Sequence, residues 1–226
     1  MFNLFSKLIS FSLKDAIKIE ESDRQFIALK KLSKNIPNKE IYLWLIIANA
    51  LVCYQLSWKW EDYREEFSEY FWKNFCDKKN FLNELKKFLR QSKNNKRLID
   101  IKISRLEKIK NFFEWGDFFW RENFFYENME IFLEEIAKNM KQKKDAKTIV
   151  FAVKMFWYWA RNFFKFQKFP EWIKIPIDSR LENLFEKYWE WEKNSKIFYQ
   201  KLSEKLKIPE LHLDAILWVN YEELMK

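Results

Sequence analysis

Hydrophobic residues recur along this chain at the three-to-four-residue spacing of an amphipathic helix, and the spacing persists nearly throughout. The chain has one glycine and four prolines, so it has few of the residues that form the tight hairpins of a sheet. The pattern predicts an all-α fold of about nine to eleven helices without a confident strand. We expect breaks between helices near Pro37, 76–80, Gly116, 167–178 and Pro209.

One segment, IYLWLIIANALVCYQL at 41–56, is apolar on nearly every side. A helix that is hydrophobic all round is buried, and this one is shorter than the roughly 20 residues that a membrane span requires. It is therefore expected to be a core helix with two polar residues, Asn49 and Gln55. Buried amides need hydrogen-bond partners. Each amide either bonds the neighbouring backbone, or Gln55 offers its amide to a ligand.

A second apolar helix, DAKTIVFAVKMFWYWAR at 145–161, begins with a lysine. With Asp145 as the N-cap, Lys147 falls in the first turn, where the helix dipole and the apolar helix both disfavour an ammonium ion. A neutral lysine amine is a nucleophile. Phe151 and Lys154 follow on the same stripe, so Phe151 is expected at the floor of a pocket beside the amine. On spacing alone, a phosphate-binding role for Lys147 is the simpler interpretation.

Charge points to a polyanionic partner. The formal net charge is +9, and the sequence pI is near 9.3. Between residues 78 and 110 the basic residues exceed the acidic ones by nine, and KNMKQKKDAK at 138–147 has five lysines and one acid. Either cluster alone is equally well a solvated face, but the two together favour a surface that binds phosphates. Nucleic acid and an anionic membrane are the two classes of partner that fit.

The cysteines and the single histidine argue against a metal or cofactor. Cys53 and Cys76 are far apart and His212 is the only histidine, which leaves no zinc-site, iron–sulfur or disulfide pattern. No signal peptide is recognised in the first 18 residues. We therefore expect an intracellular protein without metal or cofactor, in which His212 is structural.

Two further segments combine a carboxylate with a helix. In EWIKIPIDSRLENLF, Ser179 followed by Glu182 forms a capping box, which leaves Asp178 just outside the helix and free to point elsewhere. The alternative is that Asp178 only serves the helix dipole. In KIPELHLDAILW, Asp214 and Trp218 share one helical face and could hold a flat nitrogenous ring, although a core tryptophan beside a solvated acid is the simpler interpretation.

KTIVFAVKMFWYWAR, IPIDSR and IPELHLDAILW, in this order, resemble blocks of the archaeal 8-oxoguanine DNA glycosylase family (AGOG), a branch of the helix–hairpin–helix glycosylases. ANALVCYQLS and SKNNKRLIDIKISRLEKI (92–109) are similar to two further blocks, and the resemblance spans roughly residues 40–220. The chain departs from the wider superfamily in its hairpin, because KQKKDAK has none of the glycines that usually bring backbone amides to a phosphate.

The resemblance implies roles for individual residues. Lys147 matches the lysine that attacks the sugar, with Lys154 as a rival, and Asp178 matches the aspartate that assists it. The residues that match the family's recognition of the extruded base are Gln55, Phe151, Asp214, Trp218, Ser92 and Pro176.

The resemblance also implies a fold and a function. We expect residues 1–226 to form one domain of two helical lobes with the active site in the cleft between them. One lobe comes mainly from about 60–165 and the other from the N- and C-terminal helices. The implied activity is excision of 8-oxoguanine through a Schiff base, followed by strand cleavage by β-elimination.

The implied partner is double-stranded DNA that contains 8-oxoguanine, with single strands as a further possibility and no membrane. A prokaryotic protein that acts as a monomer in the cytoplasm, at the nucleoid, is the default expectation. Two alternatives stay open: a non-catalytic basic helical protein that binds nucleic acid, and a glycosylase for another base lesion.

Overall fold

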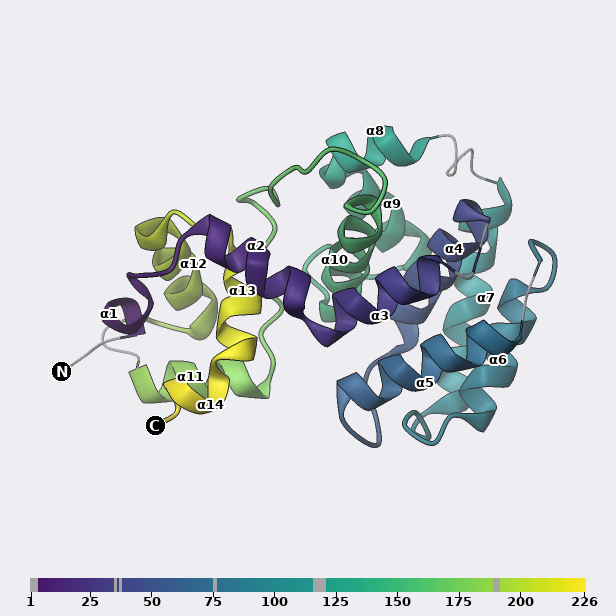
Figure 1. The fold of residues 1–226 in the computed structure, drawn as a ribbon, viewed down its shortest axis with the longest axis horizontal. Helices are drawn as coiled ribbons and strands as arrows, with labels where there is room; N and C mark the ends of the chain where they lie inside the picture. Colours follow the sequence, from purple (N-terminus) through teal and green to yellow (C-terminus); the bar gives the residue numbers. More distant parts are fainter. Residues whose placement is uncertain (1–3, 35, 37, 75–76, 116–120, 189–191) are drawn as a thin grey trace. The chain divides into compact units, whose positions relative to one another are not determined.

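The protein is helical and divides into two compact units (Figure 1). The middle unit comprises residues 24–166, and the terminal unit comprises residues 1–23 together with 167–226. The computed structural model describes residues 4–34, 36, 38–74, 77–115, 121–188 and 192–226.

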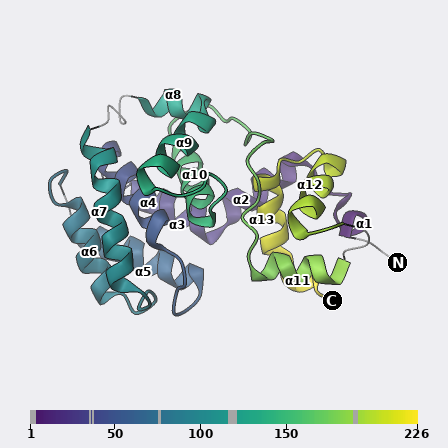
Figure 2. The same ribbon diagram turned by 180° about the vertical axis from the view of Figure 1, so that it is seen from behind.

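The middle unit is built around two apolar helices, α4 and α10, that lie side by side (Figures 1 and 2). Every residue of α4 from position 41 to 52 is buried, as is every residue of α10 from 152 to 160. Asn38 starts α4 by accepting the backbone N–H groups of Glu40 and Ile41. The helices of this unit are α3 (Arg24–Ser33), α4 (Lys39–Val52), α5 (Trp60–Lys73), α6 (Phe81–Gln91), α7 (Ile99–Trp115), α8 (Glu122–Glu127), α9 (Met129–Met140) and α10 (Lys147–Ala160).

The terminal unit joins both ends of the sequence. Its α2 packs against α13, and a capping box at Ser12 and Asp15 starts α2. Leucine, isoleucine and aromatic side chains from all of its helices share one core. The helices are α1 (Leu4–Leu8), α2 (Leu13–Ser22), α11 (Ser179–Tyr188), α12 (Ser195–Leu206), α13 (Glu210–Val219) and α14 (Tyr221–Leu224).

The all-α prediction is confirmed, and the described residues contain no strand. The predicted number of helices was too low, because the described part of the chain has fourteen. Three of these, α1, α8 and α14, are four to six residues long, which is too short to show a helical period. The breaks at 77–80, 167–178 and Pro209 are confirmed, whereas Pro37, Cys76 and Gly116 themselves lie outside the described residues.

The middle unit starts at Arg24, because α3 packs against α5 and α10, and α4 packs against α10. Across the residues that the structure describes, no helix combines the length and the apolarity needed to cross a bilayer.

Candidate functional site

Lys147 is the first residue of α10. The N-cap is Ala146, without a side-chain cap, so the prediction of Asp145 as the N-cap was wrong by one residue. The loop before α10 begins at the end of α9, where Lys141 adopts the left-handed conformation (φ 52°, ψ 48°). There the Gln142 N–H donates to the carbonyl of Ala137 and stabilises the helix end. A lysine therefore occupies the left-handed position that glycine usually fills after a helix.

The predicted stripe on α10 runs from solvent into the core. Lys147 is exposed, Phe151 is half-buried, and Lys154 is only 8% exposed. The guanidinium of Arg64 lies 5.4 Å from the centre of the Phe151 ring. Of the two lysines, Lys147 is thus the one whose amine is accessible from outside.

Gln55 lies outside the helix to which the sequence assigned it. The helix α4 ends at Val52, where the Cys53 N–H donates to the Asn49 carbonyl. Gln55 is exposed and has a left-handed backbone (φ 46°). A non-glycine residue in this region is uncommon and is held there by its surroundings. Asn49 remains inside the helix and accepts a hydrogen bond from the Tyr63 hydroxyl, so its partner is a side chain rather than neighbouring backbone.

Arg105 on α7 ties the end of α4 to the start of α10. Its Nε donates to the Leu51 carbonyl at 3.0 Å. Its Nη2 donates to Gln142 Oε1 and to Thr148 Oγ1, both at 2.9 Å. One guanidinium therefore bonds the segment that leads to Gln55 and the residue that follows Lys147.

Ser92 starts a turn that the carboxylate of Glu66 organises. The buried Ser92 hydroxyl donates to Glu66 Oε2 at 2.8 Å, and the same carboxylate accepts the backbone N–H groups of Lys93 and Asn94. The Asn94 carbonyl accepts the Ser57 N–H at 2.8 Å, which holds the turn against the segment that carries Gln55. The side chain of Ser92 thus shapes the turn.

In the terminal unit, a non-helical strip with a turn at 171–172 leads from Gln167 to Asp178 and is held by α13. The Phe169 N–H donates to His212 Nε2 at 3.0 Å, and the Ile175 N–H donates to Glu210 Oε2 at 2.9 Å. Because Nε2 accepts a hydrogen bond, Nδ1 carries the ring hydrogen and donates to Glu20 Oε1 at 2.7 Å. His212 is completely buried, which confirms its predicted structural role.

Asp178 rather than Ser179 caps α11. Asp178 Oδ1 accepts the Leu181 N–H at 2.9 Å, whereas Ser179 is already the first residue of the helix. Glu182 does not complete the predicted capping box and instead accepts a hydrogen bond from Ser195. The expectation that Asp178 points elsewhere was therefore wrong for one of its two oxygens.

Asp214 and Trp218 are both half-buried on α13. The guanidinium of Arg180 lies 3.9 Å from the centre of the Trp218 ring and 5.5 Å from that of Tyr221. A flat cation thus stacks on the indole. Arg180 stands two residues after Asp178, so the start of α11 and the indole of α13 are neighbours.

The predicted site residues fall into two sets. Those of the middle unit are Lys147, Phe151, Gln55 and Ser92, and Arg105 and the turn at 92–94 join their segments. Those of the terminal unit are Asp178, Pro176, Asp214 and Trp218, which lie on the strip and on α13.

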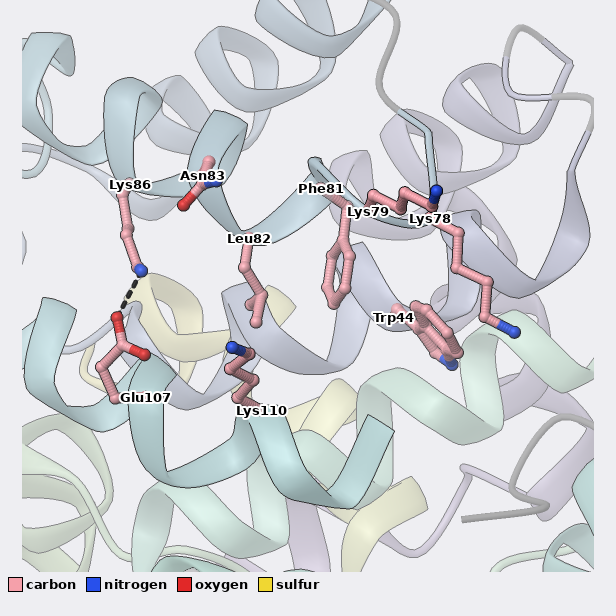
Figure 3. Close-up of a pocket in the computed structure, with 9 residues that line it drawn as sticks. All are labelled: Trp44, Lys78, Lys79, Phe81, Leu82, Asn83, Lys86, Glu107 and Lys110. Carbon is pink, nitrogen blue, oxygen red and sulfur yellow. Dashed lines mark hydrogen bonds and ion pairs between the residues drawn. The ribbon is translucent and has the colours of Figure 1, made fainter. Parts of the chain in front are cut away.

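The basic segment 78–110 presents less free charge than its composition suggests. A hollow of about 390 Å³ opens where the start of α6 meets α4 and α7 (Figure 3). Of its lysines, Lys78 pairs with Glu40 and Lys86 pairs with Glu107. Lys102, from the same segment, is completely buried, and its ammonium donates to Asn95 Oδ1. Sequence reasoning counted these residues as surface charge and missed their structural role.

Comparison with known proteins places the chain in a family. It matches the family described as AGOG, N-glycosylase/DNA lyase, over residues 6–226. The protein named N-glycosylase/DNA lyase in Methanococcus maripaludis is 39% identical over 88% of this chain and 78% of its own length. The protein of the same name in Thermococcus kodakarensis is 40% identical over 88% of this chain and 75% of its own length.

The fold has a counterpart among crystal structures. Pa-AGOG, the 8-oxoguanine DNA glycosylase from Pyrobaculum aerophilum in complex with 8-oxoguanosine, superimposes with a TM-score of 0.82. The alignment covers 96% of this chain and 85% of that chain at 21% identity. The match confirms the predicted fold, and the sequence matches give the family: the chain belongs to the AGOG family of N-glycosylase/DNA lyases.

Proposed function

We propose that this protein extrudes 8-oxoguanine from double-stranded DNA, excises it with Lys147 as the nucleophile, and then cuts the strand. The observation that carries the proposal is the position of Lys147. Lys147 is exposed at the first position of an apolar helix, and Phe151 follows one turn later. Arg105 bonds both the Leu51 carbonyl, before Gln55, and Thr148, after Lys147. Family membership and the 8-oxoguanosine complex of Pa-AGOG support the choice of lesion.

The chemistry begins with a neutral Lys147 amine, which attacks C1′ of the extruded nucleotide. The bond between C1′ and the base breaks, and the base leaves with the electron pair and takes up a proton. Ring opening of the sugar gives a Schiff base, and loss of a proton from C2′ then eliminates the 3′ phosphate. Lys154 is the weaker candidate, because its side chain is buried.

Asp178 would assist by stabilising the cationic sugar and by taking a proton from the attacking amine. Its Oδ1 caps α11, which fixes the carboxylate and leaves Oδ2 for this role. Fixing a charged group in advance of the reaction is an efficient way to stabilise a transition state.

The base would be recognised by stacking and by polar contacts. Phe151 and Trp218 would stack on the purine, at about 1–3 kcal/mol per base. Arg180 lies on the Trp218 ring, so a purine that uses this face must displace a guanidinium of similar flatness. Asp214 and Gln55 would bond the polar edge of the base. Ser92 and Pro176 would shape the surrounding segments.

Selectivity requires a hydrogen-bond acceptor near N7. Oxidation of guanine adds a carbonyl at C8 and converts N7 from an acceptor into an N–H donor. An amide oxygen, such as that of Gln55, or a backbone carbonyl would accept from the damaged base and repel the normal one. Sites built on such bonds discriminate far better than apolar slots.

Affinity for the DNA backbone would come mainly from the hairpin at 138–147 and from the exposed Lys93, Lys96 and Arg97. Extruding a nucleotide costs a few kcal/mol, which these phosphate contacts must offset. A protein that acts on chromosomal DNA is expected in the cytoplasm at the nucleoid. We expect it to act as a monomer on duplex DNA, with single strands as a further candidate substrate.

Borohydride trapping on a duplex with one 8-oxoguanine tests the proposal. The wild type should form a covalent band that Lys147→Gln abolishes and that Lys154→Gln and Lys144→Gln retain. Lys144 is the control for lost hairpin charge. Asp178→Asn should bind DNA but form little adduct. Salt-sensitive binding without a band in the wild type would favour the non-catalytic DNA-binding protein. A band with another damaged base only would favour a different lesion.

A further inference from the structure

Arg105 contacts three separate segments of the middle unit through one planar group. The Leu51 carbonyl belongs to the last turn of α4, where carbonyls have no partner within the helix. Gln142 belongs to the loop before α10, and Thr148 belongs to the first turn of α10. The Thr148 hydroxyl in turn donates to Gln142 Oε1 at 3.2 Å, so the three groups form a closed hydrogen-bonded set.

The same guanidinium also supports the aromatic residue beside Gln55. Arg105 lies 5.3 Å from the centre of the Tyr54 ring, and Lys102, one turn earlier on α7, lies 4.9 Å from it. Tyr54 therefore sits among cations that are themselves held by α7. Through the Leu51 carbonyl and the Tyr54 ring, the segment before Gln55 is thus tied to α7, and Arg105 ties the same segment to Thr148 of α10.

We propose that Arg105 is a positioning residue that sets the separation between Gln55, which reads the base, and Lys147, which attacks the sugar. The inference rests on the proposed function of these two residues. Arg105 itself touches neither substrate nor reacting atoms in this scheme. It acts by holding the last turn of α4 against the first turn of α10.

The geometry requires arginine rather than any cation. A guanidinium presents its donors in a rigid plane, so that Nε and Nη2 reach different segments at once. A lysine ammonium is a single flexible donor centre and cannot reproduce that spacing. In Arg105→Lys the charge remains, but the register between the two segments is loosened. Misplacement of reacting groups by about 1 Å lowers rates by about 100-fold.

The test compares two substrates under single-turnover conditions. For Arg105→Lys, excision from an 8-oxoguanine duplex should fall about 10- to 100-fold. Cleavage at a preformed abasic site should change by less than about threefold, because that site has no base to be read. Arg121→Lys is the matched control, since Arg121 pairs with Glu135 and lies over Phe124 and Phe125, in contacts that involve neither 51–55 nor 142–148. It should change neither rate.

A double-mutant cycle adds a readout that a merely structural role would not move. If Arg105 acts through the segment of Gln55, then Arg105→Lys should lower excision much less in a Gln55→Ala background than in the wild type. Multiplicative losses would overturn the proposal. Equal losses on the two substrates, or no loss on either, would overturn it as well.

A second variant covers the case in which Arg105→Lys does not fold, as judged by thermal unfolding. Thr148→Val removes one acceptor of the guanidinium and should lower excision selectively, in the same direction and by less. Failure of the proposed function is distinguishable, because a wild type that leaves 8-oxoguanine intact refutes the function itself. A wild type that cuts, with variants that lose both activities equally, refutes only the positioning role.

Discussion

The two units hold their irregular segments with buried charges of opposite sign. In the terminal unit, the side chains of His212 and Glu210 bind the strip before α11, and Glu20 binds His212. All three side chains are almost completely buried. In the middle unit, the buried Lys102 and the half-buried Arg105 bind the segments around Gln55. We refer to these groups as the acidic centre and the cationic centre.

The sign of each centre follows from the backbone that it serves. A strip that forms neither helix nor strand leaves N–H groups without regular backbone partners, and the acidic centre supplies acceptors for those of Phe169 and Ile175. A helix end leaves carbonyls without partners, and Arg105 supplies a donor for that of Leu51. Buried charges are costly unless they are hydrogen-bonded. Loss of a hydrogen-bond partner in either centre should therefore destabilise the protein.

The largest effect is expected in the acidic centre. Glu210→Ala removes the acceptor of the Ile175 N–H in a site that is 1% exposed. A buried hydrogen bond to a charged group contributes about 1.5–3 kcal/mol, so the free energy of unfolding should fall by about 2–3 kcal/mol. Glu210→Gln keeps an oxygen for Ile175 and should lose about half as much. Denaturant unfolding measures both.

Hydrogen exchange tests this prediction more directly, because it measures the protection of the backbone amides in the strip. The Ile175 amide should exchange faster in Glu210→Ala and stay protected in Glu210→Gln. Glu186→Ala, an exposed change on α11 of the same unit, should stay within about 0.5 kcal/mol of the wild type. Equal losses in Ala and Gln would show that the charge of Glu210, and not its bond to Ile175, stabilises the strip.

The cationic centre should respond to pH instead. Burial lowers the pKa of Lys102 to about 8, and nearby Arg97 acts in the same direction. Below pH 8 the lysine is charged in both states and contributes no pH dependence. Between about pH 8 and 10.5, the native state loses the proton before the unfolded state does, so higher pH favours the native state. The wild type should therefore gain about 1–2 kcal/mol over Lys102→Met between pH 7 and 9.5.

The measurement is urea unfolding of both proteins across this pH range. Lys108→Met, an exposed change on the same helix, should run parallel to the wild type and so controls for the general titration of lysines. A constant difference between the wild type and Lys102→Met would mean that Lys102 keeps its proton in the native state throughout the range. In that case burial would not shift the pKa of Lys102, and the effect of burial proposed here would hold for the acidic centre alone.

Sequence alone predicted the helical architecture because periodicity is a local signal, and it predicted the structural role of His212 from composition. It misplaced Gln55, because apolar residues continue past the point where α4 ends. The end of α4 is bound by residues far along the chain, such as Arg105. No local sequence pattern shows such contacts. The buried state of Lys102 was missed for the same reason.

The cap of α11 shows a second limit of sequence reasoning. Asp178 and Ser179 are both good N-caps, and a one-residue shift decides which of them is bound to the helix. The shift matters here, because it fixes the carboxylate proposed to assist Lys147. Most candidate residues stand out by their pattern, Ser92 and Pro176 come from the resemblance alone, and the roles of all of them in catalysis and base recognition remain predictions.

The smallest expected effects come from two lysines in left-handed conformations, one in each unit. Lys141 follows α9 with φ 52°, and Lys207 follows α12 with φ 55°. Glycine adopts this conformation without the steric cost that a Cβ imposes, so Lys141→Gly and Lys207→Gly should each stabilise their unit by about 0.5–1 kcal/mol. Thermal unfolding measures this gain.

DNA binding then separates the two lysines. Lys141 lies in the hairpin proposed to contact phosphates, so Lys141→Gly should weaken binding and reduce the salt dependence of affinity by about one released counterion. Lys207→Gly should leave both quantities unchanged. Lys141→Gly could stabilise the protein and still bind DNA like the wild type. In that case neither backbone geometry nor phosphate contact explains the lysine at this position. The hairpin would then owe its proposed grip on DNA to the other lysines of 138–147.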